Sequence, residues 1–298
     1  MSDNPKPTVS EIFSRSKDDI VEFLGGIYEH SAWVATELVE TDVSAIKTVT
    51  DLAGAMKAVV ADASRERKLE LLCAHPDLCE KVSALKALTK ESQEEQSSAG
   101  LQSLTEDELK TFTENNNAYR EKFQFPFILA VRNATKYTVL AAMKGRVKNS
   151  LEVEFAQALA QVNKIAWMRI LSKMRSDEEK GFLTCHVLDT ANGCPADNMR
   201  IHLHKINSEG KLELLGEFIT NDDGRLTGGP ALKGPAFVVG VYQWTFYVAE
   251  YFASKGSSTA GTPFLDVIPL RFGIDNPDDH YHVPLLASPW SFSTYRGS

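Results

Sequence analysis

Met199-Arg200-Ile201-His202-Leu203-His204 is a run in which apolar and polar side chains alternate. Successive side chains of a β-strand point to opposite faces, so this period of two predicts a strand with one buried face. The alternation returns in residues 268–274, and Asp222-Asp223-Gly224 between the two runs has the composition of a tight turn. Several short strands separated by turns predict a β-sandwich for this part of the chain.

The first part of the chain has a helical period instead. Apolar residues recur three and four positions apart in residues 20–28, and Thr105 with Glu108 has the form of a capping box. Residues 149–174 form a long amphipathic stretch with Phe155, Leu159, Val162 and Ala166 on one face. The change of period predicts an all-α domain followed by an all-β domain.

A short charged segment separates the two periods. Residues 175–181, Arg-Ser-Asp-Glu-Glu-Lys-Gly, have no apolar pattern, as expected of a connection between domains. We therefore predict a disordered lead-in at 1–7, a helical domain at 8–174, a linker at 175–181 and a β domain at 182–298.

Composition excludes several classes of protein. The net charge is −8 over 298 residues, which disfavours a nucleic-acid partner because phosphates require a basic surface. No apolar run approaches the roughly 20 residues that span a bilayer, and no apolar signal core follows Met1. The four cysteines match neither a zinc pattern nor a disulfide framework, so we expect reduced thiols, as in the cytoplasm.

Four segments of the predicted β domain occur in the order found in one known family. They are Leu183-Thr184-Cys185-His186-Val187-Leu188-Asp189, Asp223-Gly224-Arg225, Tyr281-His282-Val283-Pro284 and Tyr295-Arg296-Gly297-Ser298. Together they resemble the 5-hydroxyisourate hydrolases, which are transthyretin-like enzymes of urate breakdown. The chain departs from the family at Cys185, where these enzymes usually carry Thr; the strand period places Cys185 on the face opposite His186.

The resemblance implies that His186, Arg225, His282 and Ser298 line an active site, with Tyr295 close by. Hydrolysis of a cyclic amide needs a base for water, which an imidazole supplies near neutral pH. Arg225 keeps its proton, so it binds or polarises an oxygen. The chemistry requires no metal, although converging histidines could imitate a zinc site.

Considered one at a time, these residues have ordinary structural explanations. His186 alone would be a strand histidine and Arg225 a hairpin residue; only the joint pattern favours catalysis. We expect His202 and His204 to lie on the surface and His280 to flank the site without chemistry. The family further implies a homotetramer. The alternative is a transthyretin-like carrier of small molecules, which lacks this histidine–arginine set.

Three motifs of the helical half also occur in a known order. They are Leu72-Cys73-Ala74-His75-Pro76-Asp77-Leu78, Ser92-Gln93-Glu94-Glu95-Gln96-Ser97-Ser98-Ala99-Gly100-Leu101 and Phe125-Pro126-Phe127-Ile128. They resemble the motifs of 2-oxo-4-hydroxy-4-carboxy-5-ureidoimidazoline (OHCU) decarboxylases over residues 8–174, with a poor match at 40–50. Those enzymes convert the product of the hydrolase to S-allantoin.

Two residues of this half have unusual placements. Pro76 disfavours helix before it and favours helix after it, so His75 is predicted at a helix N-terminus, which attracts anions. Arg169 falls on the apolar face of the predicted helix at 149–174. A buried guanidinium needs a carboxylate, from the protein or from a ligand, and the resemblance favours the ligand.

The resemblance assigns a substrate site to this half. Arg169 and the helix N-terminus at His75-Pro76 would hold the substrate, assisted by backbone amides of the segment that contains Phe127, Ile128 and Val131. Ser92, Glu95 and Gln96 would bind the ureido or ring nitrogens, and His75 would handle the proton that replaces the carboxylate. No cofactor is implied, because the imine of the substrate takes up the electron pair.

These residues have ordinary explanations as well. Ser92 with Glu95 also has the form of a capping box, His75 alone would be a helix residue, and Arg169 could extend its charge to the helix end. Phe127 and Ile128 would otherwise be plain core. The joint occurrence of three spaced motifs favours the decarboxylase.

The two resemblances support each other, because the product of the hydrolase is the substrate of the decarboxylase. The whole chain is similar to the fused transthyretin-like enzymes of plants, which implies that it acts on small molecules, works after urate oxidase and forms S-allantoin. The alternative is that one domain alone is catalytic and the other is a carrier or assembly module. We expect a cytoplasmic location, with the peroxisome as alternative, because neither an internal R-L-x5-H-L signal nor an S-K-L ending is found.

Overall fold

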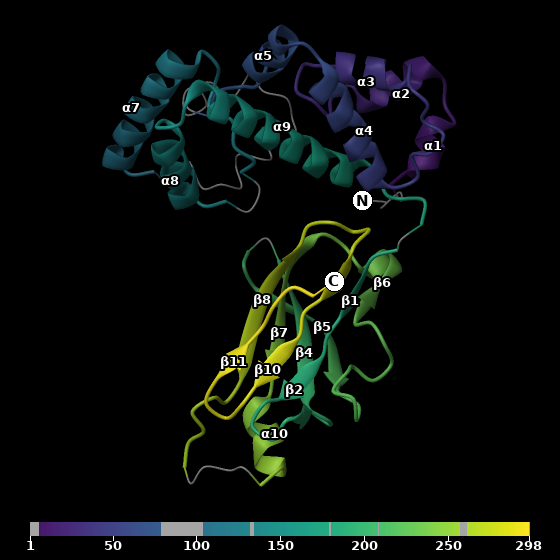
Figure 1. Ribbon diagram of the computed structural model, residues 1–298, viewed down its shortest axis with the longest axis vertical. Helices are drawn as coiled ribbons and strands as arrows, with labels where there is room; N and C mark the ends of the chain where they lie inside the picture. The colour runs from purple at the N-terminus through teal and green to yellow at the C-terminus, as the bar shows by residue number, and fades with distance from the viewer. Residues whose placement is uncertain are drawn as a thin grey trace. The chain divides into compact units, whose positions relative to one another are not determined.

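The computed structural model describes residues 6–78, 104–131, 134–178, 180–207, 209–256 and 261–297 (Figure 1). The chain divides into two compact units, Met1–Asp177 and Glu178–Ser298. The first residues of the predicted linker pack on the helical unit: Arg175 pairs with Thr8 in a parallel bridge, and Ser176 Oγ accepts a hydrogen bond of 2.9 Å from the Val49 amide. Asp177 accepts one of 2.8 Å from the amide of Ser10.

The first unit is helical throughout its described part. Its helices are α1 (Val9–Phe13), α2 (Lys17–Leu24), α3 (Trp33–Leu38), α4 (Val49–Asp62), α5 (Arg65–Cys73), α7 (Glu106–Phe123), α8 (Lys136–Arg146) and α9 (Leu151–Lys173). The predicted capping box of Thr105 and Glu108 opens α7, and the predicted long helix at 149–174 is α9. The apolar stripe at 20–28 continues beyond α2, which ends at Leu24 before two glycines, residues that disfavour helix.

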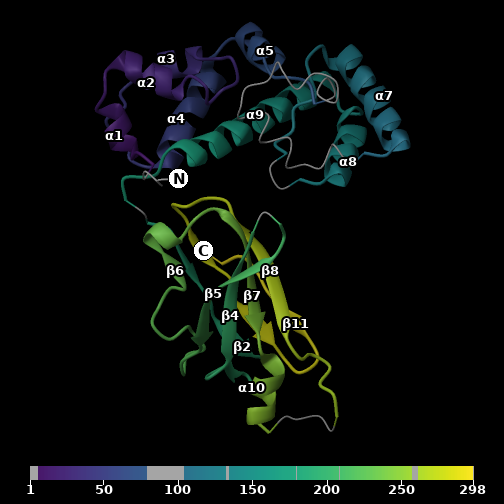
Figure 2. The same cartoon turned by 180° about the vertical axis from the view of Figure 1, so that it is seen from behind.

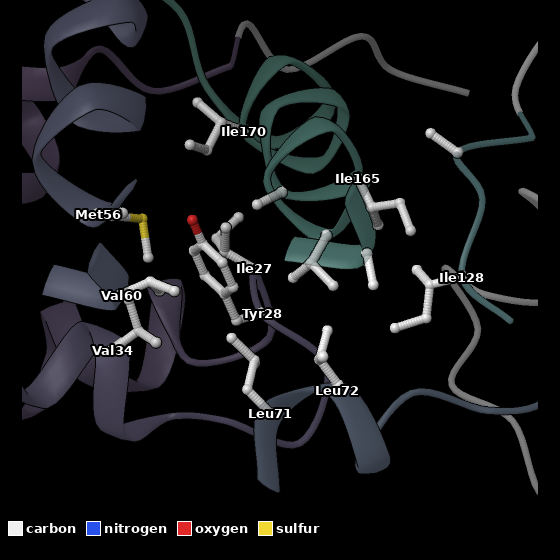
Figure 3. Packing of buried hydrophobic residues seen from close by; sticks show 14 of the residues in the cluster. Ile27, Tyr28, Val34, Met56, Val60, Leu71, Leu72, Ile128, Ile165 and Ile170 are labelled. Carbon is white, nitrogen blue, oxygen red and sulfur yellow. The ribbon is translucent and has the colours of Figure 1, made fainter. Parts of the chain in front are cut away.

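Apolar side chains from most of these helices form one core. Figure 3 shows Tyr28 at its centre, near Val34 of α3 and Met56 and Val60 of α4. The buried hydroxyl of Tyr28 donates a hydrogen bond of 2.6 Å to Asn163 Oδ1 on α9. Because a buried phenol needs a partner, this bond ties the loop after α2 to α9.

The second unit is built from short strands. They are β1 (Phe182–Thr184), β2 (Val187–Asp189), β3 (Cys194–Pro195), β4 (Arg200–Ile206), β5 (Leu212–Ile219), β6 (Leu232–Lys233), β7 (Gly240–Phe246), β8 (Ile268–Ile274), β9 (His280–His282), β10 (Leu285–Ala287) and β11 (Phe292–Ser293). The strands predicted from the alternations at 199–204 and 268–274 are confirmed as β4 and β8. One short helix, α10 (Val248–Ser254), was not predicted.

The strands form a sandwich, as predicted. One layer is an antiparallel sheet in the order β5-β4-β7-β8, and the other contains the sheets β6-β1-β9 and β11-β10-β2-β3 (Figures 1 and 2). Leu183 and Val187 from one layer and Ile201 and Trp244 from the other are buried in a common core. In strands such as β4 and β8 the layers thus bury one face and leave the other face more exposed, whereas β5 has no buried residue.

His202 and His204 differ from the prediction that placed them on the surface. Both rings are half-buried, and the side chain of His202 is only 13% exposed. His202 Nδ1 lies 3.0 Å from the hydroxyl of Tyr247, which covers it. Sequence periodicity identified the correct face of β4 but not the side chains that pack over that face.

No helix in the described ranges combines the length and the apolar character needed to cross a membrane.

Candidate active sites

Strand pairing brings the predicted hydrolase residues together. β1 and β9 are parallel, with Thr184 opposite His282, and β2 and β10 continue the same arrangement. His186 lies between β1 and β2, where its carbonyl accepts a hydrogen bond of 2.9 Å from the Leu285 amide. Consequently, two chain segments almost a hundred residues apart present His186 and His282 with ring centroids 6.4 Å apart.

A tight turn delivers Arg225 to His186. Asn221 Oδ1 accepts hydrogen bonds from the amides of Asp223 at 3.1 Å and Arg225 at 2.9 Å. Gly224 has φ +73°, and a Cβ there would lie 2.3 Å from the carbonyl oxygen of Val187, so the close approach requires glycine. Arg225 and His186 then form a backbone bridge.

His282 is held by the end of the chain. The Gly297 amide donates a hydrogen bond of 2.9 Å to the His282 carbonyl, and a Cβ at Gly297 would lie 2.7 Å from His282 Cδ2. Desolvation, with the nearby charges of Arg225, His186 and His280, lowers the pKa of His282. The imidazole is therefore neutral at physiological pH and able to accept a proton.

The C-terminal segment forms one side of an open depression. Its lining residues are Asp279, His280, His282, Tyr295, Arg296 and Gly297. The structure thus places Tyr295 near His282, as predicted, and its side chain is exposed. Ser298 lies outside the described residues, so its predicted role stays a prediction.

Two neighbours in this site were not predicted to take part. Thr184 Oγ1 lies 2.8 Å from His280 Nε2 and 2.9 Å from His282 Nδ1. The signal was available, because Thr184 and His186, like His280 and His282, are two positions apart and share a strand face. Cys185 points into the core, as expected, and burial raises the pKa of its thiol.

In the helical unit, His75 lies just after the C-terminal end of α5. It does not lie at the start of any helix in the described part of the chain. Its Nδ1 lies 2.9 Å from the Leu71 carbonyl oxygen, which accepts from Nδ1–H and leaves the lone pair on Nε2. Nε2 is buried and has no hydrogen-bond partner among the residues that the structure describes. Burial lowers the pKa of His75 to about 4, so the ring is neutral. Residues 76–78 are not helical, so the helix predicted to begin at Pro76 is not found there; the chain directly after Leu78 lies outside the described residues.

Arg169 is buried on α9, as predicted, and meets a carboxylate of the protein. It forms an ion pair with Glu29, a residue that sequence reasoning missed; both side chains are almost fully buried. Arg169 Nη1 also donates to the carbonyl oxygens of Gly26 at 3.3 Å and Ile27 at 3.5 Å. The charges of Glu29 and Arg169 both act on the pKa of His75, so these three groups share one site.

The segment with Phe127, Ile128 and Val131 connects α7 to α8 in the sequence. All three of these residues are buried. Figure 3 shows Ile128 in the same cluster as Leu72, which precedes His75, and Ile165, one turn before Arg169. The segment thus belongs to the same core as the residues that flank His75 and Arg169. One of its amides, that of Ala130, already donates to Gln161 Oε1 at 3.0 Å.

A buried ion pair and its hydrogen bonds support this segment. Arg146 Nη1 donates a hydrogen bond of 2.7 Å to the Ile128 carbonyl oxygen, and its guanidinium lies 4.6 Å from the centre of the Phe127 ring. Glu154, fully buried, pairs with Arg146 and accepts a hydrogen bond from the Tyr119 hydroxyl. The predicted ligands Ser92, Glu95 and Gln96 lie outside the described residues.

The two sites define a chain that carries two enzymes. The model of the OHCU decarboxylase family matches residues 14–171, and that of the HIUase/Transthyretin family matches residues 183–297. The chain belongs to both families, one for each unit. The resemblances stated from the motifs are thereby confirmed.

Individual relatives agree with this assignment. A 5-hydroxyisourate hydrolase of Pseudomonas aeruginosa is 49% identical over 118 residues, which are 40% of this chain and 92% of the relative. An OHCU decarboxylase of Haloferax volcanii is 40% identical over 170 residues, 57% of this chain and 98% of the relative. The crystal structure of an (S)-allantoin synthase is similar to the chain as a whole, with 60% identity, a TM-score of 0.86 and coverage of 98% of this chain and 100% of the other.

Proposed function

We propose that the chain converts 5-hydroxyisourate to S-allantoin in two steps, hydrolysis in the β unit and decarboxylation in the helical unit. The observation that carries this proposal is that one chain contains a domain of each of two enzyme families. In each domain the predicted catalytic histidine lies close to an arginine. Consecutive reactions in one chain limit the loss of an unstable intermediate.

For the hydrolysis, we assign the general base to His282. Its Nδ1 faces Thr184, so Nε2 is the nitrogen left to take a proton from the attacking water. Arg225, which keeps its charge, stabilises the oxygen that becomes negative as the amide carbon is attacked. His186, whose Nε2 is buried and has no partner in the described part of the chain, donates a proton to the ring nitrogen that leaves when the C–N bond breaks.

For the decarboxylation, we assign the proton transfer to His75. Its neutral ring carries a lone pair on Nε2, which takes up the proton of the 4-hydroxyl as that oxygen becomes a carbonyl and delivers it to the adjacent carbon that bears the ureido group. The electron pair of the broken C–C bond moves into the imine of the substrate. Delivery of the proton from one side only fixes the S configuration, and Arg169 binds the substrate carboxylate while Glu29 holds the guanidinium.

The alternative assigns chemistry to one unit and carriage or assembly to the other. Circular dichroism of urate turned over by urate oxidase separates the possibilities, because spontaneous decay gives racemic allantoin. We expect a rapid, lasting S-allantoin signal with the chain present. A transient signal that decays would mean hydrolysis alone, and a time course identical to that of the oxidase would refute both activities.

We extend the proposal to assembly and location. We propose a homotetramer, supported by exposed apolar side chains on β5, namely Leu212, Leu214, Leu215 and Ile219, which an interface would cover. Light scattering after gel filtration tests it: a tetramer mass supports the proposal, and a monomer refutes it. We further propose that the chain acts after urate oxidase in the cytoplasm, consistent with free Cys73, Cys185 and Cys194.

A further inference from the structure

A hydroxyl lies between two imidazoles on the strand face that carries the hydrolase site. Thr184 Oγ1 is 2.8 Å from His280 Nε2 and 2.9 Å from His282 Nδ1. The parallel register places Phe182 opposite His280 and Thr184 opposite His282, so these side chains share one face. The Phe182 ring stacks on His280 with centroids 4.1 Å apart and planes 20° apart, which restrains the plane of the imidazole.

The direction of these hydrogen bonds is constrained, because a hydroxyl has one proton to donate. When Thr184 donates to His280 Nε2, it accepts from His282 Nδ1–H, and the lone pair of His282 is on Nε2. When His280 Nε2 carries a proton, the hydroxyl turns and donates to His282 Nδ1, and His282 carries its proton on Nε2. Only the first arrangement gives water a base. The Tyr281 carbonyl, which this hydroxyl also approaches, is farther away at 3.5 Å.

We propose that Thr184 and His280 are positioning residues of the hydrolase site, and that protonation of His280 turns the Thr184 hydroxyl and removes His282 as general base. The inference rests on the proposed hydrolysis of 5-hydroxyisourate. Neither residue needs to touch the substrate. The switch moves no net proton through Thr184, because the hydroxyl only rotates while His282 changes its tautomer through exchange with water.

The surrounding charges define what else titrates near this pair. Arg225 and His186 act on His282, and Asp279 and Arg296, paired at 3.3 Å, line the depression beside His280. Arg225 and Arg296 keep their charge over the working range of the assay. The variants below change only Thr184 or His280 and keep these neighbours, so a comparison of their pH profiles tests the switch.

The pH profile of kcat/KM tests the proposal. Two protonations disable the base, that of His282 directly and that of His280 through the hydroxyl. We therefore expect kcat/KM to fall steeply as the pH is lowered. In His280→Gln the amide oxygen accepts from Thr184 at every pH, and the acid slope should fall by about one unit. In Thr184→Val the acid slope should also fall by about one unit. Its kcat on the plateau should be about 10-fold lower than that of the wild type, with little change in KM, because the tautomer of His282 is no longer fixed. Thr184→Ser keeps the hydroxyl and should keep the wild-type profile.

The assay follows the absorbance of 5-hydroxyisourate made freshly from urate, with the spontaneous decay subtracted at each pH. A His280→Gln profile as steep as that of the wild type would overturn the proposal, and this result does not depend on the folding of Thr184→Val. Equal losses in Thr184→Ser and Thr184→Val would also overturn it, because the hydroxyl would then be irrelevant.

A second measurement is independent of activity. The ¹⁵N shifts of the His282 ring, assigned by their loss in His282→Asn, report its tautomer in histidine-labelled protein. We expect protonated Nδ1 at high pH and a change to protonated Nε2 as His280 titrates; an unchanged tautomer would overturn the switch. A wild-type chain that fails to hydrolyse 5-hydroxyisourate would refute the proposed function, and the ring shifts would still decide the switch.

Discussion

The guanidinium of Arg169 is paired with the carboxylate of Glu29, and both side chains are almost completely buried. The pair joins α9 to the loop after α2, two segments 140 positions apart in sequence. Both charges also act on the pKa of His75. The Glu29 carboxylate therefore holds Arg169 in place when no substrate is bound, and the pair sets the electrostatic environment of His75, the proposed proton carrier.

Replacement of Glu29 by Gln should therefore destabilise the helical unit and weaken decarboxylation. Removal of one charge from a buried ion pair costs about 3–5 kcal/mol. Urea unfolding followed by helical circular dichroism measures the loss. The control is Glu152→Gln, which breaks the exposed Arg65–Glu152 pair and should leave the unfolding midpoint almost unchanged, because water screens an exposed pair. Equal effects of the two variants would contradict the structural role of the buried pair.

His75 should make the helical unit sensitive to acid. Its folded pKa of about 4 lies below the ordinary histidine value of about 6.5, so the unfolded chain binds a proton first as the pH falls. The free energy of unfolding should decline between pH 6.5 and 4, on the order of 3 kcal/mol from this group. His75→Gln lacks this component, so its unfolding free energy should change less over the same window. Parallel declines in both proteins would contradict the prediction.

The two activities should be separable by single substitutions. His75→Ala should abolish decarboxylation and leave hydrolysis intact, and His186→Ala should slow hydrolysis by about 10²–10⁴-fold and leave decarboxylation intact. Each step is assayed with its own substrate, OHCU for the second being made in situ by a separate hydrolase. A folded variant that loses both activities would argue against independent sites.

Gly297→Ala should disturb the hydrolase site through His282. The added Cβ would lie 2.7 Å from His282 Cδ2, so the imidazole or the chain end has to move, and a displacement of about 1 Å can cost about 100-fold in rate. Gly273→Ala in β8 is the matched control, because nothing lies within 4 Å of its Cβ and its φ is not positive. Wild-type hydrolysis by Gly297→Ala would mean that the chain end does not position His282.

Tyr119→Phe should destabilise the network behind the Phe127–Val131 segment. The Tyr119 hydroxyl donates to buried Glu154, and burial raises the pKa of this phenol, which keeps its proton. Loss of this bond to a charged group should cost about 1.5–3 kcal/mol. Tyr137→Phe, at a side chain 65% exposed, should leave the unfolding midpoint unchanged, and a comparable shift in this control would refute the assignment.

Local patterns predicted much of the fold. The alternation in β4 and β8, the capping box at Thr105 and the amphipathic period of α9 each reflect contacts within a few residues, so they are legible in sequence. The unexpected features involve distant contacts: the partner of Arg169, and the side chains that cover His202. A helical wheel shows that an arginine faces the core, but it does not show which carboxylate the core supplies.

The sequence by itself determined the two domains, their periods and the motifs that place the chain in two enzyme families. It also named His75, His186, Arg225 and His282, because motif residues keep their order and spacing. Tertiary structure alone decided which groups meet: Glu29 with Arg169, and Thr184 between His280 and His282. Such pairs depend on strand register and helix packing between segments far apart in sequence, and a hydrogen bond requires a precision of a few tenths of an ångström that no local pattern encodes.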